Sequence, residues 1–163
     1  MYLYFILVTL WVLPTLAIWV EYRRQTGPLL ELAGKWFLFI GVGVRLSVAG
    51  LSQILRPGFT AAMLHLDTGA HVIIQELGFT NLLLGGIALL SLFKPGYRVL
   101  ATGGAWFMGF AGFLHLSRLS RETTTNETIA LISDLWIFAV ATVYLGYRIV
   151  EKRRGTTGRM TVS

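Results

Sequence analysis

The sequence predicts an all-α integral membrane protein, a helical bundle with about five transmembrane helices. The composition supports this fold class, because 55% of the 163 residues are hydrophobic and only 13% are charged. Soluble domains carry about 25% charged residues. The apolar residues also form five long runs, each close to the ~20 residues that cross a ~30 Å hydrocarbon core. Because the segments between these runs are short, we expect a single membrane domain over residues 1–163.

The first two predicted spans lie at about residues 1–20 and 36–55. The first is uncharged and lacks the basic start and small-residue cleavage site of a signal peptide, so we interpret it as a span. Pro14 is expected to kink it. The second span ends at an Arg-Pro-Gly sequence that begins at Arg56, which is a strong helix stop. Residues 58–69 have mixed polarity and are predicted to lie as a short helix along the membrane surface.

The last three predicted spans lie at about residues 70–93, 99–119 and 128–150. The third is followed by a Lys-Pro-Gly turn, and the fifth by a charged Glu-Lys-Arg-Arg sequence. The fourth carries small residues at helical spacing, which allow neighbouring helices to approach closely. We therefore expect one face of the fourth helix to contact protein rather than lipid, the face formed by Ala101, Ala105, Gly109 and Gly112.

The charges between the spans predict the orientation in the membrane. With five spans, the first loop, the third loop and the C-terminus share one side, and most basic residues lie on that side: Arg23, Arg24, Lys35, Lys94, Arg98, Arg148, Lys152, Arg153, Arg154 and Arg159. The other side holds Arg56, Arg118 and Arg121. The positive-inside rule then predicts an outside N-terminus and a cytoplasmic C-terminus in the cytoplasmic membrane. The net charge of +6 is explained by lipid contact, and we expect no nucleic acid.

Polar side chains within the spans are the candidates for a functional site, because they are costly in a bilayer. Four different helices each carry one ionisable group, and all four lie toward the predicted outer half: Arg45, Glu76, His115 and Asp134. Asn81 lies on the third helix, on the same face as Gly78 and Gly85. Arg45 is expected to pair with Glu76 or Asp134, because a buried charge needs a partner. We predict that Arg45, Glu76, Asn81, His115 and Asp134 form a ligand-binding site.

Other interpretations of these residues stay open. A structural network that specifies helix register explains them as well as a pocket for a small molecule or lipid does. A metal held by Glu76, His115 and Asp134 is less favoured because the spacing matches no known ligand motif. A haem between His71 and His115 is less favoured because histidines near helix ends are more often interfacial. We therefore predict no metal site and leave the cofactor and any catalytic residue unassigned. The absence of cysteine excludes disulfides and thiol chemistry within this sequence.

Three segments resemble a known family. They are VRLSVAGLSQILRPGF, IIQELGFTNLLLGGIALL and RVLATGGAWFMGFAGFLHL. Together they cover roughly residues 39–116 and resemble the DoxX-like superfamily of small four-helix membrane proteins, with residues 128–150 as the remaining helix. The resemblance implies that Arg45, Glu76 and His115 are recurrent intramembrane polar positions. Some members are subunits of membrane oxidoreductases, including thiosulfate:quinone oxidoreductase. This chain differs by its additional first helix, residues 1–20.

Three functional hypotheses follow. The leading one is an accessory or small-ligand-binding subunit of a membrane complex, for which the family resemblance implies a link to redox or quinone chemistry. A transporter or channel that uses intramembrane carboxylates is the second, and flux into liposomes would distinguish it. An enzyme that acts on lipid or quinone is the third, and it would need product formation that depends on His115. The expected partners are the lipid bilayer, another polypeptide of a membrane complex, and a small-molecule or quinone ligand.

Overall fold

The computed structural model describes residues 2–24, 27–117 and 125–160, with side chains described from Leu3 and, in the last segment, as far as Arg154. These residues form helices and no strand. Five continuous helical rods are long and apolar enough to cross a membrane: Leu3–Arg24, Leu29–Leu55, Thr68–Leu90, Tyr97–Ser117 and Thr125–Arg154. The all-α helical bundle with five such helices is therefore confirmed. Met1, residues 118–119 of the predicted fourth span, and both Arg118 and Arg121 lie outside the described residues.

The first rod contains a π-helical turn where the sequence predicts a kink. It consists of α1 (Tyr2–Leu7), the π-helical segment η1 (Val8–Val12) and α2 (Leu13–Arg24). Leu13 donates its backbone N–H to the carbonyl of Val8, five residues earlier. Pro14 follows at once and has no N–H to donate, so a regular α-helical bond is missing at this point. The irregularity expected at Pro14 is thus a widened turn.

The second rod begins earlier than predicted. It consists of α3 (Leu29–Trp36), the π-helical segment η2 (Phe37–Val44) and α4 (Arg45–Leu55). Hydropathy placed the boundary at residue 36, because the preceding residues include charged side chains. Pro28 directly precedes the observed first residue, a position where proline does not interrupt a helix. The short α5 (Pro57–Met63) and the 3₁₀ turn η3 (Thr68–Ala70) follow. A short helix is confirmed here, and its position along a membrane surface stays a prediction.

The remaining rods are α6 (His71–Leu90), α7 (Tyr97–Ser117) and α8 (Thr125–Met160), and glycine allows them to pack closely. A Cβ on Gly50 would lie 2.6 Å from the carbonyl oxygen of Gly78, so α4 and α6 nearly touch through their backbones. A Cβ on Gly109 would lie 2.5 Å from the Phe138 ring. The predicted small-residue face of α7 is buried and packs on α8, which confirms that it contacts protein: Ala101, Ala105, Gly109 and Gly112.

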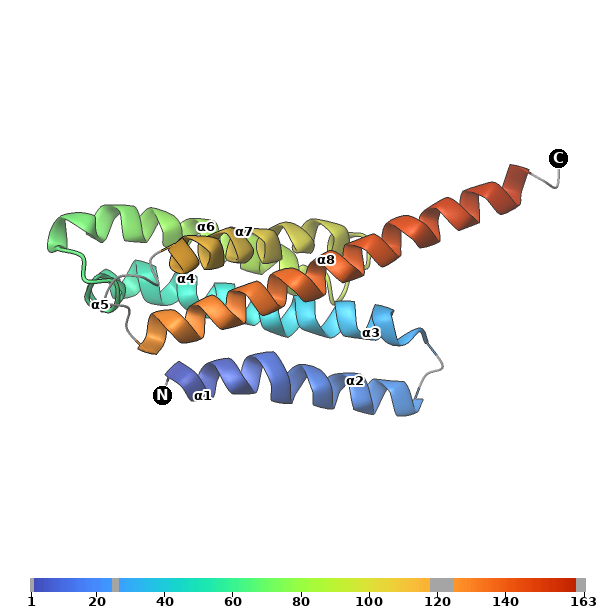
Figure 1. The fold of residues 1–163 in the computed structure, drawn as a ribbon, viewed down its shortest axis with the longest axis horizontal. Coiled ribbons are helices and arrows are strands. Elements are labelled where there is room, and N and C mark those ends of the chain that lie inside the picture. The colour runs from blue at the N-terminus through green and yellow to red at the C-terminus, as the bar shows by residue number, and fades with distance from the viewer. Residues whose placement is uncertain (1, 25–26, 118–124, 161–163) are drawn as a thin grey trace.

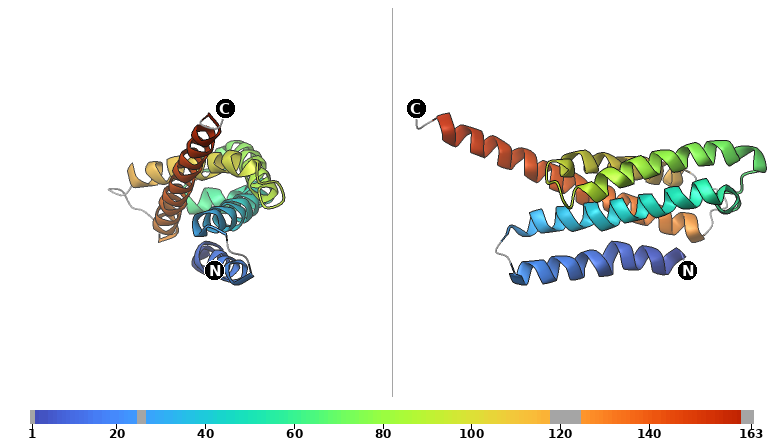
Figure 2. Two further views of the ribbon diagram at one scale, coloured as in Figure 1. Left: turned by 90° about the vertical axis from the view of Figure 1, so that its right-hand side faces the viewer. Right: turned by 180° about the vertical axis from the view of Figure 1, so that it is seen from behind.

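The bundle has two ends of different character (Figure 1). The cavity end contains the N-terminus, α5, and the first residues of α6 and α8. The basic end contains the connections from α2 to α3 and from α6 to α7, and α8 extends past it. Figure 2 shows that the first rod lies on one side of the bundle rather than at its centre.

The basic residues are distributed between the two ends as the sequence predicts. Basic residues gather at the basic end: Arg23, Arg24, Lys35, Lys94, Arg98, Arg148, Lys152, Arg153 and Arg154. Arg56 lies at the cavity end, after α4. The side chain of Arg159 lies outside the described residues. That the basic end faces the cytoplasm stays a prediction from the positive-inside rule.

Candidate functional site

A buried ion pair joins the second and fifth rods. Nη2 of Arg45 donates to Oδ1 of Asp134 over 3.0 Å and to Oγ of Ser133 over 3.0 Å. Only 6% of the Arg45 side chain and 11% of the Asp134 side chain are exposed. Ser133 in turn donates to the Ala130 carbonyl, so its hydroxyl is engaged in both directions. Of the two partners predicted for Arg45, the structure selects Asp134.

The pair borders a cavity of about 340 Å³ at the cavity end. Small-molecule sites usually range from roughly 300 to 1,000 Å³, so this cavity lies at the small end of that range. Its walls come from all five rods and from α5, and they are mainly apolar. The structure brings four of the five predicted site residues to this cavity: Arg45, Asn81, His115 and Asp134.

A second polar contact lies on the α6 side of the cavity. Nδ2 of Asn81 donates to Oε1 of Gln53 over 2.7 Å, and both side chains line the cavity. Gln53 was missed by the sequence analysis, which considered ionisable groups first. A signal existed, because Gln53 follows Arg45 by eight residues and Ala49 by four, and such spacing places residues on one helix face.

Two buried polar atoms of the cavity lining have no partner within the described residues. They are Nη1 of Arg45 and Oδ1 of Asn81. Arg45 as a whole is 6% exposed and Asn81 is 5% exposed, so bulk water does not cover them. An unsatisfied buried polar group costs about 1–3 kcal/mol, and more when it is charged. The cavity thus presents one donor and one acceptor that a ligand or an enclosed water molecule would satisfy.

Glu76 does not join this site. It lies on α6 with an exposed side chain and does not line the cavity. The physical reason is helical geometry, because five residues separate Glu76 from Asn81 and a rotation of about 100° per residue puts them on different faces. The proposed metal set of Glu76, His115 and Asp134 is therefore not assembled. Over the described residues, no group of three histidine, aspartate or glutamate side chains is placed to hold a metal ion.

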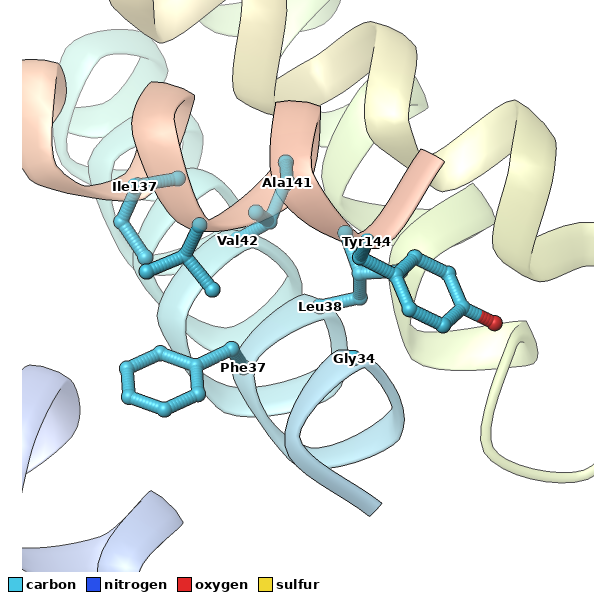
Figure 3. Close-up of a pocket in the computed structure, with 8 residues that line it drawn as sticks. Gly34, Phe37, Leu38, Val42, Ile137, Ala141 and Tyr144 are labelled. Carbon is cyan, nitrogen blue, oxygen red and sulfur yellow. The ribbon is translucent and has the colours of Figure 1, made fainter. Parts of the chain in front are cut away.

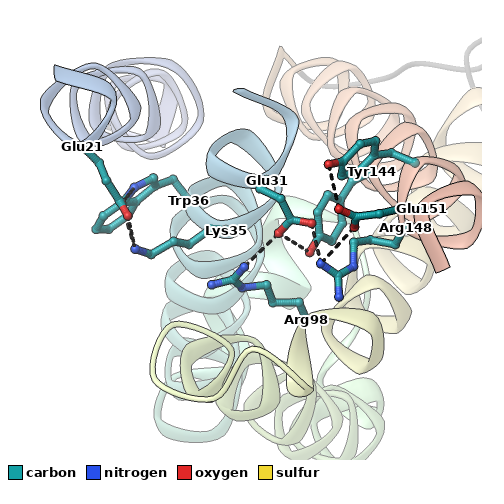
Figure 4. A network of polar contacts seen from close by, with 9 residues as sticks. Glu21, Glu31, Lys35, Trp36, Arg98, Tyr144, Arg148 and Glu151 are labelled. Carbon is teal, nitrogen blue, oxygen red and sulfur yellow. Dashed lines mark hydrogen bonds and ion pairs between the residues drawn. The ribbon is translucent and has the colours of Figure 1, made fainter. Parts of the chain in front are cut away.

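The basic end carries a separate polar network that the sequence analysis did not predict (Figure 4). Glu31 of α3 accepts from Arg98 of α7 over 3.0 Å, and it also accepts from Arg148 of α8. Its carboxylate lies 3.5 Å from the hydroxyl of Tyr144. These contacts connect three rods. They were missed because hydropathy placed Glu31 in a loop rather than in a helix.

Glu21 forms the corresponding link to the first rod. Its carboxylate accepts from Nζ of Lys35 over 2.7 and 2.8 Å and from Nε1 of Trp36 over 2.7 Å. Figure 4 shows that these side chains point toward one another between α2 and α3. These contacts join α2 to α3 at the basic end, so an ion pair as well as apolar packing holds the first rod against the second.

Side chains pack tightly where η2 meets α8 (Figure 3). The contact lies around Leu38, Ile137 and Tyr144, which are at most 2% exposed. The space between them has a volume of about 0 Å³, which is too small for a water molecule. A second cavity, of about 700 Å³, lies between α2 and η2 and reaches Glu21 and Trp36 at the basic end.

The fold and the cavity define a multi-pass helical membrane protein with a polar site between its helices. A family model described as DUF6790, a family of unknown function, matches residues 1–154. The chain belongs to this family. No curated protein and no solved structure matches the sequence.

Proposed function

We propose that this protein binds a small amphipathic molecule in the Arg45–Asp134 cavity, as the ligand-binding or accessory subunit of a complex in the cytoplasmic membrane. The observation that carries the proposal is a cavity of about 340 Å³ whose lining contains two buried polar atoms without partners. Buried polar atoms without partners are uncommon in folded proteins, and these two border a space that a molecule can occupy.

The lining fits a molecule with one polar end. Most of its lining residues are apolar, and the polar side chains among them are Arg45, Ser52, Gln53, Thr60, Asn81, His115 and Asp134. Binding sites of this kind bury the apolar body of a ligand, while a few placed polar groups fix its orientation. The proposal therefore requires both a polar group near Arg45 and an apolar part that extends from it.

Access from the bilayer is consistent with the exposure of the walls. Val48 of α4 is 44% exposed and Phe59 of α5 is 59% exposed, yet both line the cavity. Apolar side chains exposed on a membrane helix contact lipid tails, which are equally apolar. We therefore expect the cavity to reach the lipid-facing surface between α4 and α5. A molecule dissolved in the bilayer would enter without crossing the packed half of the bundle.

A channel stays an alternative. A pathway between η2 and α8 would need to pass Leu38, Ile137 and Tyr144, where no volume remains, but a cavity of about 700 Å³ lies on another side of η2, against α2. The link to quinone or redox chemistry rests on the DoxX-like resemblance and stays a prediction, as does the role of His115 in an enzyme.

Native mass spectrometry of the protein purified in mild detergent from its own membrane tests the proposal. We expect wild type to carry a reproducible small-molecule mass above its 18.1 kDa. Ala111→Phe, which fills the cavity, should lose that mass. The matched control Ala62→Phe should keep it, because Ala62 is exposed on α5 and does not line the cavity.

Bare protein in all three samples would refute ligand binding. A mass excess that persists in Ala111→Phe would place the ligand elsewhere. An additional polypeptide in the wild-type spectrum would support the accessory-subunit part of the proposal, and the small-molecule part would still be judged by the cavity variant.

A further inference from the structure

We infer that the ligand is an uncharged amphiphile from the bilayer, whose head group accepts a hydrogen bond from Arg45 and donates one to Asn81. This inference rests on the proposed function and specifies the chemical class of the molecule. The features that carry it are the charge balance of the cavity lining and the two unpartnered polar atoms.

The charge balance excludes an ionic head group. Arg45 and Asp134 are the charged residues of the lining, and they neutralise each other across 3.0 Å. The pair therefore leaves no net charge of its own to compensate an anion or a cation. An ion in a mainly apolar cavity loses its hydration and needs a counter-charge to offset that loss. A neutral head group avoids this requirement.

The unpartnered atoms specify what the head group must contain. The guanidinium of Arg45 only donates hydrogen bonds, so its free Nη1 requires an acceptor oxygen. Oδ1 of Asn81 is an acceptor and requires a donor, and Asn81 is held in place by its bond to Gln53. An ester or ketone oxygen next to a hydroxyl supplies both groups. A monoacylglycerol is one simple molecule of this class.

The apolar walls specify the remainder of the ligand. Leu46, Phe107 and Met108 line the cavity, and its exposed edge is formed by Val48 and Phe59. An acyl chain that lies along these residues buries its methylene groups, and each buried methylene strengthens binding by about fourfold. The ligand should therefore bind far more tightly than its isolated head group.

Four probes distinguish the alternatives by titration calorimetry with the full-length protein, purified in detergent and depleted of ligand. Three carry a ten-carbon chain and differ in the head group: 1-monodecanoylglycerol, decanoate at pH 8 and decyltrimethylammonium. The fourth, monoacetin, has the uncharged head group and almost no chain. We expect saturable binding of monodecanoylglycerol, binding of monoacetin at least about 100-fold weaker, and no saturable binding of the two ions.

Variants near the head group connect the result to the structure. Asn81→Ala should weaken binding of monodecanoylglycerol by about fivefold, the value of one lost hydrogen bond. Thr80→Ala is the matched control on the same helix, because Thr80 is exposed and does not line the cavity. It should bind like wild type. Equal affinity of wild type and Asn81→Ala would overturn the assigned donor contact.

The remaining outcomes separate this inference from the proposed function. Tighter binding of decanoate or of the ammonium probe would overturn the uncharged class and still support a ligand site in the cavity. If no probe binds, the inference is wrong, whereas the proposed function is judged independently by the mass excess of protein from its own membrane. Binding of monoacetin as tight as that of monodecanoylglycerol would exclude a bilayer-derived ligand.

Discussion

The two ends of the bundle differ in the space beside their buried polar groups. At the basic end, the Glu31 carboxylate receives Arg98, Arg148 and Tyr144 from two other rods, and one buried atom of this network, Nε of Arg98, has no partner within the described residues. At the cavity end, Arg45 pairs with Asp134 and keeps one unpartnered nitrogen beside a cavity of about 340 Å³. Both ends are built by the same helices, so the difference lies in whether an unpartnered polar atom borders a cavity.

This contrast indicates a division of roles along the bundle. A membrane helix pair gains little from the hydrophobic effect, because lipid tails are as apolar as the side chains. Close packing, as between Gly50 and Gly78, and polar contacts such as those at the basic end therefore determine how the rods are arranged. Unsatisfied groups at the cavity end lower stability, and such groups are expected where binding requires them. Four predictions test whether the two ends differ in this way.

The largest effect is expected from breaking the buried ion pair at the cavity end. Asp134→Ala leaves Arg45 buried without its counter-charge, and the free energy of unfolding should fall by about 3–5 kcal/mol. Titration with sodium dodecyl sulfate in mixed micelles measures this value. The double variant Arg45→Met/Asp134→Leu removes both charges and should recover most of the loss. If the double variant is as unstable as Asp134→Ala, the loss of stability does not come from the unpaired charge of Arg45.

A smaller effect is expected from the packing near the basic end. A Cβ on Gly34 would overlap the ring of Tyr144, which is buried and has little room to move. Gly34→Ala should therefore destabilise the protein by about 1–3 kcal/mol in the same titration. Gly103→Ala is the control, because nothing lies within 4 Å of a Cβ at Gly103. A similar loss in both variants would show that the region is less tightly packed than the structure indicates.

Removing the charge of Glu31 should have a more modest effect. Glu31→Gln weakens the contacts with Arg98 and Arg148, of which Arg148 is 38% exposed, and should cost about 1 kcal/mol. The exposed Glu151 offers the matched control Glu151→Gln, which should leave stability unchanged. The ligand mass seen by native mass spectrometry should persist in both variants. Loss of ligand from Glu31→Gln alone would show that the basic end affects ligand binding, which would contradict separate roles for the two ends.

The smallest effect is expected at Glu76. Its side chain is exposed and outside the cavity, so Glu76→Gln should change the free energy of unfolding by less than about 0.5 kcal/mol. The ligand mass should also be retained in native mass spectrometry. Loss of the ligand in this variant would show that Glu76 belongs to the binding site, as the sequence analysis predicted. The arrangement of α6 would then have to differ from the one described.

Several features were predictable because they depend on local patterns. Five apolar runs predict five spans, since each must satisfy its own backbone in lipid. Small residues at helical spacing on α7 predict a face that contacts another helix. The sequence analysis also placed Asn81 on the same helix face as Gly78, and in the structure Gly78 packs on α4. It included Glu76 in the site as well, because a carboxylate within a span is a strong signal for a site.

Other features depended on how distant segments meet. Glu21 and Glu31 were assigned to a loop because charged residues end a hydropathy run, although their partners on other helices make them part of the bundle. The π-helical segment Phe37–Val44 also changes the direction of side chains before Arg45. A π turn contains more residues than an α turn, so faces extrapolated at an α-helical period lose their register there.

The sequence by itself determined that the chain is an all-α membrane bundle with five spans, that its basic residues gather at one end, and which polar residues are candidates for a site. These properties follow from composition and from periodicity along one helix. Only the tertiary structure decided that Arg45 pairs with Asp134, that Asn81 and His115 share the cavity while Glu76 does not, and that Glu31 joins three helices. The physical reason is that partners far apart in sequence are selected by helix rotation and close packing, which single-helix patterns do not specify.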